Sequence, residues 1–192
     1  SRNKKGIIMI DFQNCTYEEL AHALYLKGEM DGYPKVTDKT KWREPVMAER
    51  LGHKAHSKIS AGAGTLQYGS DALDLATGRY AEYKSQALNE KSMRNLNKVA
   101  KTKNTFFAAL TVTGVYNGAY KQSALDAYAE VDHYFGIFFQ EQLQLVIKVN
   151  TDEVINQLTT NNAKRKPGAS TNLNAVHINL DDTHLYKEVY KI

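Results

Sequence analysis

Acidic and basic residues suited to catalysis gather in one short segment of the chain. Asp71 and Asp74 stand on one side of a Thr-Gly pair, and Glu82 and Lys84 stand on the other. The runs on both sides are short and alternate between apolar and polar residues, and the Thr-Gly pair suits a turn. This segment therefore predicts a β-hairpin that carries acids and a lysine on neighbouring strands.

The position of the turn decides which of these side chains share a face. With residues 77–78 as the turn, partners across the hairpin have numbers that sum to 155, so Asp71 lies opposite Lys84. Side chains alternate between the two faces of a strand, which puts Asp71, Glu82 and Lys84 on one face and Asp74 on the other. A one-residue bulge would bring in Asp74 instead. We predict that Asp71 is the acid on this face.

Two carboxylates on adjacent strands can share a hard divalent cation. Mg²⁺ prefers a few carboxylates completed by water and phosphate oxygens. A lysine beside them can hold the attacking water and balance charge near the scissile phosphate. We therefore expect Asp71 and Glu82 to bind Mg²⁺ and Lys84 to assist phosphodiester hydrolysis. The structural alternative is an ordinary cross-strand Asp–Lys pair on an exposed hairpin.

The pattern Asp71…Glu82-x-Lys84 resembles the signature of the PD-(D/E)xK nuclease superfamily, which includes type II restriction endonucleases and Holliday-junction resolvases. The resemblance covers roughly residues 45–150, and it departs from the family pattern at Ser70, where a proline is usual. It implies a restriction-endonuclease-like fold, a mixed central sheet flanked by helices, with the three residues on a central hairpin.

The same resemblance implies a further catalytic glutamate on a helix before the hairpin. Glu49 is our preferred candidate, because a position inside the predicted helix has a fixed direction. Glu44, just before Pro45 at the start of that helix, is the alternative.

Further elements follow from caps and apolar spacing. Thr16 and Glu19 form a capping box that opens a helix, which we expect to end at Gly28. Pro45 suits the first turn of a second helix, whose apolar stripe continues to Ala55. The rest of the chain predicts a helix at 87–104, a strand at 106–115, a short helix or loop at 123–131, strands at 134–139 and 143–149, a helix at 151–158 capped by Thr151, and a strand at 175–180. Several strands with flanking helices indicate an α/β or α+β class with a mixed sheet.

Two basic segments favour a DNA partner. The polar face of the predicted helix at 87–104 is placed to contact phosphates. The loop at 161–174 is rich in basic residues and asparagine, and arginine and asparagine can read guanine and adenine in the major groove. Each segment can also be an ordinary solvated surface. The candidate DNA-binding residues are Lys91, Arg94, Lys98, Lys164, Arg165, Lys166 and Asn172.

The length and charge of the chain suit one basic domain. It has 192 residues and a formal net charge of +4, which permits a polyanionic partner without establishing one. We expect a single nuclease domain over residues 1–192, with a catalytic core at about 45–150 and a DNA-contacting segment at about 160–192.

Other kinds of site are disfavoured by the sequence. A single cysteine, Cys15, excludes a disulfide framework and a four-cysteine zinc site. His53 and His56 have no second pair that would complete a zinc site. The segment Gly62-Ala-Gly64 lacks the Lys-Ser/Thr of a phosphate-binding loop, so we expect no nucleotide cofactor. No apolar run approaches the ~20 residues of a membrane span, and the first residues do not resemble a secretory signal. We expect a cytoplasmic protein of prokaryotic or phage origin, with no membrane partner.

These observations lead to one preferred function and two alternatives. The preferred function is a Mg²⁺-dependent type II restriction endonuclease that acts as a homodimer on a short site in duplex DNA. The first alternative is a structure-selective DNA nuclease, such as a junction resolvase or repair enzyme. The second is a non-catalytic nucleic-acid-binding module, in which the hairpin charges form a salt bridge.

Overall fold

The computed structural model describes residues 11, 13–31, 39–55, 70–90, 92–93, 110–165 and 173–192. The helices in these ranges are α1 (Tyr17–Asp31), α2 (Lys39–Leu51), α5 (Gln122–Ala129) and α6 (Thr151–Ala163), with a short 3-10 helix, η1 (Thr183–Leu185). The strands are β1 (His53–Ala55), β2 (Ala72–Asp74), β3 (Tyr80–Leu88), β4 (Thr111–Asn117), β5 (Asp132–Phe139), β6 (Gln142–Val149), β7 (Leu173–Asn179) and β8 (Tyr186–Lys191).

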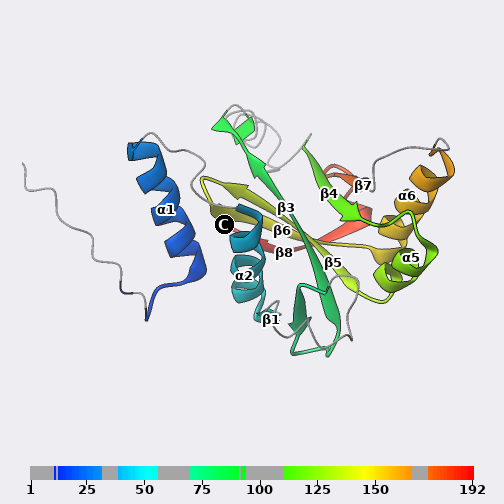
Figure 1. The fold of residues 1–192 in the computed structure, drawn as a ribbon, viewed down its shortest axis with the longest axis horizontal. Coiled ribbons are helices and arrows are strands. Elements are labelled where there is room, and N and C mark those ends of the chain that lie inside the picture. Colours follow the sequence, from blue (N-terminus) through cyan, green and yellow to red (C-terminus); the bar gives the residue numbers. More distant parts are fainter. Residues whose placement is uncertain are drawn as a thin grey trace, which may run out of the picture.

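The described strands form one large sheet and one small sheet (Figure 1). The large sheet has the order β1-β2-β3-β5-β6-β8, in which β3 and β5 are parallel and all other neighbours are antiparallel. Strands β4 and β7 form the second, antiparallel sheet. Helices α1 and α2 lie toward one end of the molecule, and α5 and α6 lie at the other (Figure 1). The predicted class, a mixed central sheet flanked by helices, is confirmed.

The large sheet is covered on its two faces by different apolar clusters. One cluster joins β5 and β6 to the small sheet and to α5 and α6, and it includes Phe135 and Ile147. The other packs α2 against the opposite face and includes Met47, Tyr134 and Val146. Strands covered on both faces carry nearly continuous apolar runs, and β5 and β6 have this pattern. Strand β3 lies beside β5 and therefore faces both clusters.

Helix α1 begins at the predicted capping box. The Thr16 N–H donates to Glu19 Oε2 at 2.8 Å, and the Glu19 N–H donates to Thr16 Oγ1 at 3.2 Å. The predicted end at Gly28 is wrong, because α1 continues to Asp31. Gly28 is buried within the helix, so it occupies a packing position and does not mark a stop.

Helix α2 begins six residues before Pro45, which was expected in its first turn. A proline inside a helix removes one backbone hydrogen bond and destabilises the helix. A tertiary contact offsets this cost, because the Arg43 guanidinium makes two hydrogen bonds to buried Glu141, at 3.0 and 2.8 Å. Such a long-range ion pair has no signal in the local sequence, so the predicted start was wrong.

A short strand that was not predicted follows α2. Gly52 has a φ of 69°, a left-handed conformation that glycine adopts readily where a helix ends. The next three residues pair with β2 as strand β1. His53, expected on the tail of the helix, therefore lies in the large sheet. His56 and the segment Gly62–Gly64 lie outside the described residues.

The second half of the chain follows the predicted order with shifted ends. Strand β3 extends to Leu88, so the helix predicted at 87–104 cannot begin at residue 87, and only residues 90, 92 and 93 of it are described as helical. Asn150 precedes α6 in the cap position expected for Thr151, whose hydroxyl instead donates to the Val131 carbonyl at 3.3 Å. Helix α6 continues to Ala163, and strand β8 was not predicted.

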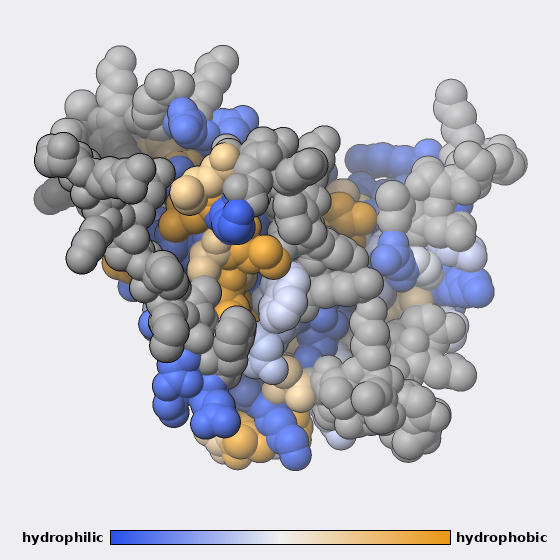
Figure 2. Space-filling view, turned by 60° about the vertical axis from the view of Figure 1, so that its left-hand side comes forward, coloured by the Kyte–Doolittle hydropathy of each residue, from blue (hydrophilic) through white to orange (hydrophobic). Residues whose placement is uncertain are grey.

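No helix in the described part of the chain is long and apolar enough to cross a membrane. From the side of α1 and α2, hydrophobic and hydrophilic side chains lie next to one another on the described surface (Figure 2). The large apolar side chains that are exposed include Leu26 and Met30 of α1.

Candidate active site

The β2–β3 hairpin has a different register from the one predicted. Ala72 pairs with Ala81, so partner numbers sum to 153. Asp71, which directly precedes β2, is therefore aligned with Glu82. The prediction that Asp71 lies opposite Lys84 is wrong by two residues.

The turn of the hairpin explains this shift. The Asp74 carboxylate accepts hydrogen bonds from the Ala76 N–H at 2.9 Å and from the Thr77 hydroxyl at 2.7 Å. Aspartate readily forms such side-chain turns, which compete with a tight two-residue turn. The loop closes at Gly78, which has a φ of 71°.

A shift of two residues preserves the face of every side chain. Asp71, Glu82 and Lys84 share one face of the hairpin, as expected, because the side-chain period of a strand is two. The Tyr83 N–H donates to Asp71 Oδ2 at 2.7 Å and fixes the direction of that carboxylate. Asp74 lies on the opposite face, where its carboxylate is 3.9 Å from His53 Nε2.

Glu82 is the most buried acid of this group, with 3 % of its surface exposed. Its Oε1 accepts a hydrogen bond from Lys84 Nζ, and its buried Oε2 has no hydrogen-bond partner among the described residues. Burial raises the pKa of the Glu82 carboxyl to about 8, although the Lys84 charge opposes this rise. The charges of Asp71 and Glu44 raise the same pKa further. A buried carboxylate oxygen without a partner is rare in a folded protein and calls for a specific explanation.

Lys84 is held between Glu82 and the small sheet. Its Nζ lies 4.7 Å from the ring centroid of Tyr116 on β4. A cation over the face of an aromatic ring is attracted by the ring's negative face. The Lys84 side chain therefore has two defined partners, one carboxylate and one ring.

The hydroxyl of Tyr116 contacts a buried histidine, His133. Tyr116 donates its hydroxyl hydrogen to His133 Nδ1 at 2.9 Å, and His133 Nε2 donates to the Tyr128 carbonyl at 2.8 Å. A carbonyl oxygen can only accept, so Nε2 carries a proton. Burial lowers the pKa of His133 to about 4.

Gln86, two residues beyond Lys84, joins the two sheets. Its Oε1 accepts a hydrogen bond from the Thr113 N–H of β4 at 2.9 Å. The face that carries Glu82, Lys84 and Gln86 therefore lies along the seam between β3 and β4.

The structure distinguishes the two glutamates proposed for helix α2. Glu49 is exposed, and its Oε2 accepts from the Tyr17 N–H at 3.1 Å, so it helps to cap helix α1. Glu44 is partly buried, and its charge acts on Glu82. Of the two alternatives, Glu44 is the one that is brought to the candidate site, and the preferred Glu49 is not.

Only two of the candidate DNA-binding residues lie in the described ranges. Lys164 is exposed just after α6, and the Arg165 guanidinium lies 4.7 Å from the ring centroid of Tyr120. Residues outside the described ranges are Lys91, Arg94, Lys98, Lys166 and Asn172.

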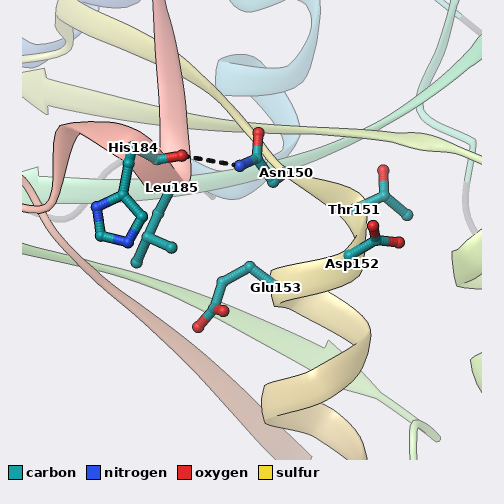
Figure 3. Close-up of a pocket in the computed structure, with 6 residues that line it drawn as sticks. All are labelled: Asn150, Thr151, Asp152, Glu153, His184 and Leu185. Carbon is teal, nitrogen blue, oxygen red and sulfur yellow. Dashed lines mark hydrogen bonds between the residues drawn. The ribbon is translucent and has the colours of Figure 1, made fainter.

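Two other features of the described chain do not add to this site. No group of three or more His, Cys, Asp or Glu side chains among the described residues could hold a metal ion. A shallow pocket of about 440 Å³ lies at the start of α6, where Asn150 Nδ2 donates to the His184 carbonyl at 3.0 Å (Figure 3). Its wall includes Asp152 and Glu153, and none of the predicted site residues.

No protein-family model matches the sequence, and no curated protein is significantly similar to it.

Two residues of the site had no predicted role. Tyr116 and His133 belong to it only because β4 packs across β3 and β5, which local sequence patterns do not specify. The even spacing of Val112 and Tyr116, which puts both on one face of a strand, was the available signal that this ring faces the core.

Proposed function

We propose that this protein is a Mg²⁺-dependent nuclease that hydrolyses phosphodiester bonds at Asp71, Glu82 and Lys84. The observation that carries the proposal is the buried Glu82 carboxylate, whose Oε2 has no hydrogen-bond partner among the described residues. Asp71 and Lys84 lie on the same face of the hairpin, so one carboxylate oxygen is available where a second acid and a cation converge.

These groups fit Mg²⁺ better than a softer metal. The donors are hard carboxylate oxygens, and Mg²⁺ takes one or two carboxylates together with water and phosphate oxygens. Asp71 and Glu82 would hold the ion, and Glu44 would add negative charge nearby. When bound, Mg²⁺ would polarise the phosphate and lower the pKa of a water molecule.

The protein's own groups have separate tasks in this proposal. The hydrogen bond from the Tyr83 N–H keeps the Asp71 carboxylate in one direction. Lys84 holds the attacking water and balances the charge that develops on the phosphate. The low exposure of Glu82 keeps these charges away from bulk water, where their interactions would be weaker.

The substrate we propose is duplex DNA, cut at a short specific site by a homodimer of the type II restriction kind. Support comes from the resemblance of Asp71…Glu82-x-Lys84 to that superfamily, from the net charge of +4 and from the exposed Lys164. A mixed sheet in which β3 of the hairpin pairs in parallel with β5 also suits a restriction-endonuclease-like fold. A structure-selective nuclease would use the same site, so the substrate must be tested separately.

Cleavage of supercoiled plasmid in Mg²⁺ tests the proposal. Wild type should produce nicked or linear DNA, and Asp71→Asn and Lys84→Ala should not. Asp74→Asn is the matched control, since Asp74 is on the same hairpin but faces the other way, and asparagine can form the same side-chain turn. Equal cleavage by all four proteins would refute the site assignment. Discrete bands from plasmid, against cutting of branched DNA alone, separate a sequence-specific from a structure-selective enzyme.

A further inference from the structure

The ammonium of Lys84 packs against the ring of Tyr116, a residue of the small sheet. Its Nζ lies 4.7 Å from the Tyr116 ring centroid, and only 17 % of the Lys84 side chain is exposed. The attraction between a cation and a ring is stronger at a site with little water than at an exposed one. Glu82 holds the same ammonium through its Oε1.

The ring beneath Lys84 is itself rigid. Tyr116 is fully buried, and its hydroxyl donates to His133 Nδ1 at 2.9 Å. The Tyr128 ring packs edge-on against it, with centroids 5.0 Å apart and planes at 83°. Burial and these two contacts restrain the ring against turning away from the lysine.

A glycine on β4 leaves room for the lysine stem. A Cβ built at Gly114 would lie 2.5 Å from Cζ of Phe135 and 3.0 Å from Cγ of Lys84. The backbone of β4 therefore passes directly beside the aliphatic part of Lys84. Any side chain at this position would displace Lys84 or Phe135.

We infer that Tyr116 is a positioning residue, which holds the Lys84 ammonium beside Glu82 in the orientation that catalysis requires. This inference rests on the proposed function. A lysine has a long flexible stem, and a catalytic group is effective only when it is held close to its productive geometry. The ring supplies this restraint without a second negative charge, which would compete with the scissile phosphate for the ammonium.

Two substitutions distinguish the contribution of the Tyr116 ring from that of its hydroxyl. Tyr116→Phe keeps the ring and loses the hydrogen bond to His133, whereas Tyr116→Leu loses the ring. Tyr116→Leu should lower kcat for DNA cleavage about tenfold or more, with KM nearly unchanged, because the lysine loses its orientation. Tyr116→Phe should keep most of the wild-type kcat. Tyr186→Leu is the control for loss of a partly buried tyrosine elsewhere, and it should cleave like wild type.

A measurement on the unsubstituted protein covers the case in which Tyr116→Leu does not fold. The NMR signals of the Lys84 ε-methylene protons should be shifted upfield by the ring current of Tyr116, and the shift should persist in Tyr116→Phe. An unshifted Lys84 signal, or a folded Tyr116→Leu variant with wild-type kcat, would overturn the inference. If wild type shows the shifted signal but cuts no DNA, the proposed function has failed, and the catalytic role of Tyr116 fails with it while the contact stands.

Discussion

Glu82 lies between Asp71 and Lys84 with one carboxylate oxygen bound and the other unpartnered within the described residues. Burial of a carboxylate is unfavourable unless hydrogen bonds or opposite charges compensate for the lost water. The raised pKa of Glu82 shows that Lys84 compensates only in part. Strongly shifted acids of this kind concentrate at sites that bind ions or perform chemistry. At the scale of single residues, Glu82 is therefore the best marker of the candidate site.

Replacing this acid with its neutral isostere should separate stability from activity. A pKa of about 8 favours the neutral form of Glu82 at pH 7 when no metal is bound, and a bound cation would favour the carboxylate. Glu82→Gln should therefore keep its free energy of unfolding within about 1 kcal/mol of wild type, measured by urea denaturation. Its Mg²⁺-dependent cleavage should fall by at least about a hundredfold, because a metal ligand is lost.

The opposite result would favour a structural ion pair. If Glu82 and Lys84 served only to hold the hairpin, removal of the charge should cost about 3 kcal/mol or more, as for other broken buried pairs. Lys84→Met, which removes the other partner, is the matched variant for that comparison.

His133 should make the stability of the protein depend on pH. Its pKa is about 4 in the folded protein and near 6.5 when unfolded, so the unfolded state binds more protons between these values. The contribution to stability is complete above pH 6.5 and is lost as the pH falls toward 4. Wild type should lose about 2 kcal/mol between pH 7 and pH 5 relative to His133→Gln, which can hydrogen-bond but cannot titrate.

The pKa of His133 depends on the charged and titratable groups around it. The groups that face His133 are the Tyr116 hydroxyl, the Tyr128 carbonyl, and the charges of Lys84 and Asp132. Equal pH dependence of wild type and His133→Gln in denaturation experiments would show that folding does not lower the pKa of His133.

At the scale of elements, the hairpin shows what its sequence can and cannot specify. Alternation along β2 and β3 predicts which residues share a face, and this prediction survives a register shift of two residues. The register itself depends on the Asp74 side chain, which closes a longer turn than Thr77-Gly78 alone suggests. The early start of α2 depends on Arg43 and Glu141, which are far apart in sequence. Local sequence patterns predict the periodicity of a helix or strand. Long-range polar contacts influence the residues at which it begins and ends.

Helix α2 provides a direct comparison of two glutamates on one element. Glu44→Gln should lower Mg²⁺-dependent cleavage about tenfold, because a carboxylate whose charge reaches Glu82 is neutralised. Glu49→Gln should cleave like wild type and should lower stability by up to about 1 kcal/mol, since it weakens the cap of helix α1. Cleavage rates that fall only in Glu49→Gln would restore Glu49 as the helix carboxylate.

At the scale of the whole molecule, the packing of two sheets creates the candidate site. The large sheet presents Glu82 and Lys84, and the small sheet presents Tyr116 and closes the seam through Gln86 and Thr113. The sequence predicts a mixed sheet with helices, but it carries no signal that β4 leaves that sheet to pair with β7. The shared face of Asp71, Glu82 and Lys84 was therefore predictable from their spacing. The contact between the Lys84 ammonium and the Tyr116 ring was not.

Binding of Mg²⁺ should stabilise the folded molecule as a whole. An ion that binds only the folded state raises the free energy of unfolding by about 1.4 kcal/mol when its concentration is tenfold above its Kd. Thermal denaturation should therefore show a higher Tm in Mg²⁺ than in EDTA for wild type. Asp71→Asn should lose this increase, and Asp74→Asn should keep it. An identical Tm in Mg²⁺ and EDTA for wild type, at concentrations that support cleavage, would count against a site in the folded protein.

The most direct test of the central claim is the single-turnover rate of duplex DNA cleavage in Mg²⁺, measured for wild type, Glu82→Gln and Asp74→Asn. We predict cleavage by wild type and Asp74→Asn at similar rates, none by any of the three in EDTA, and a rate at least about a hundredfold lower for Glu82→Gln. Cleavage by Glu82→Gln at the wild-type rate would contradict the account.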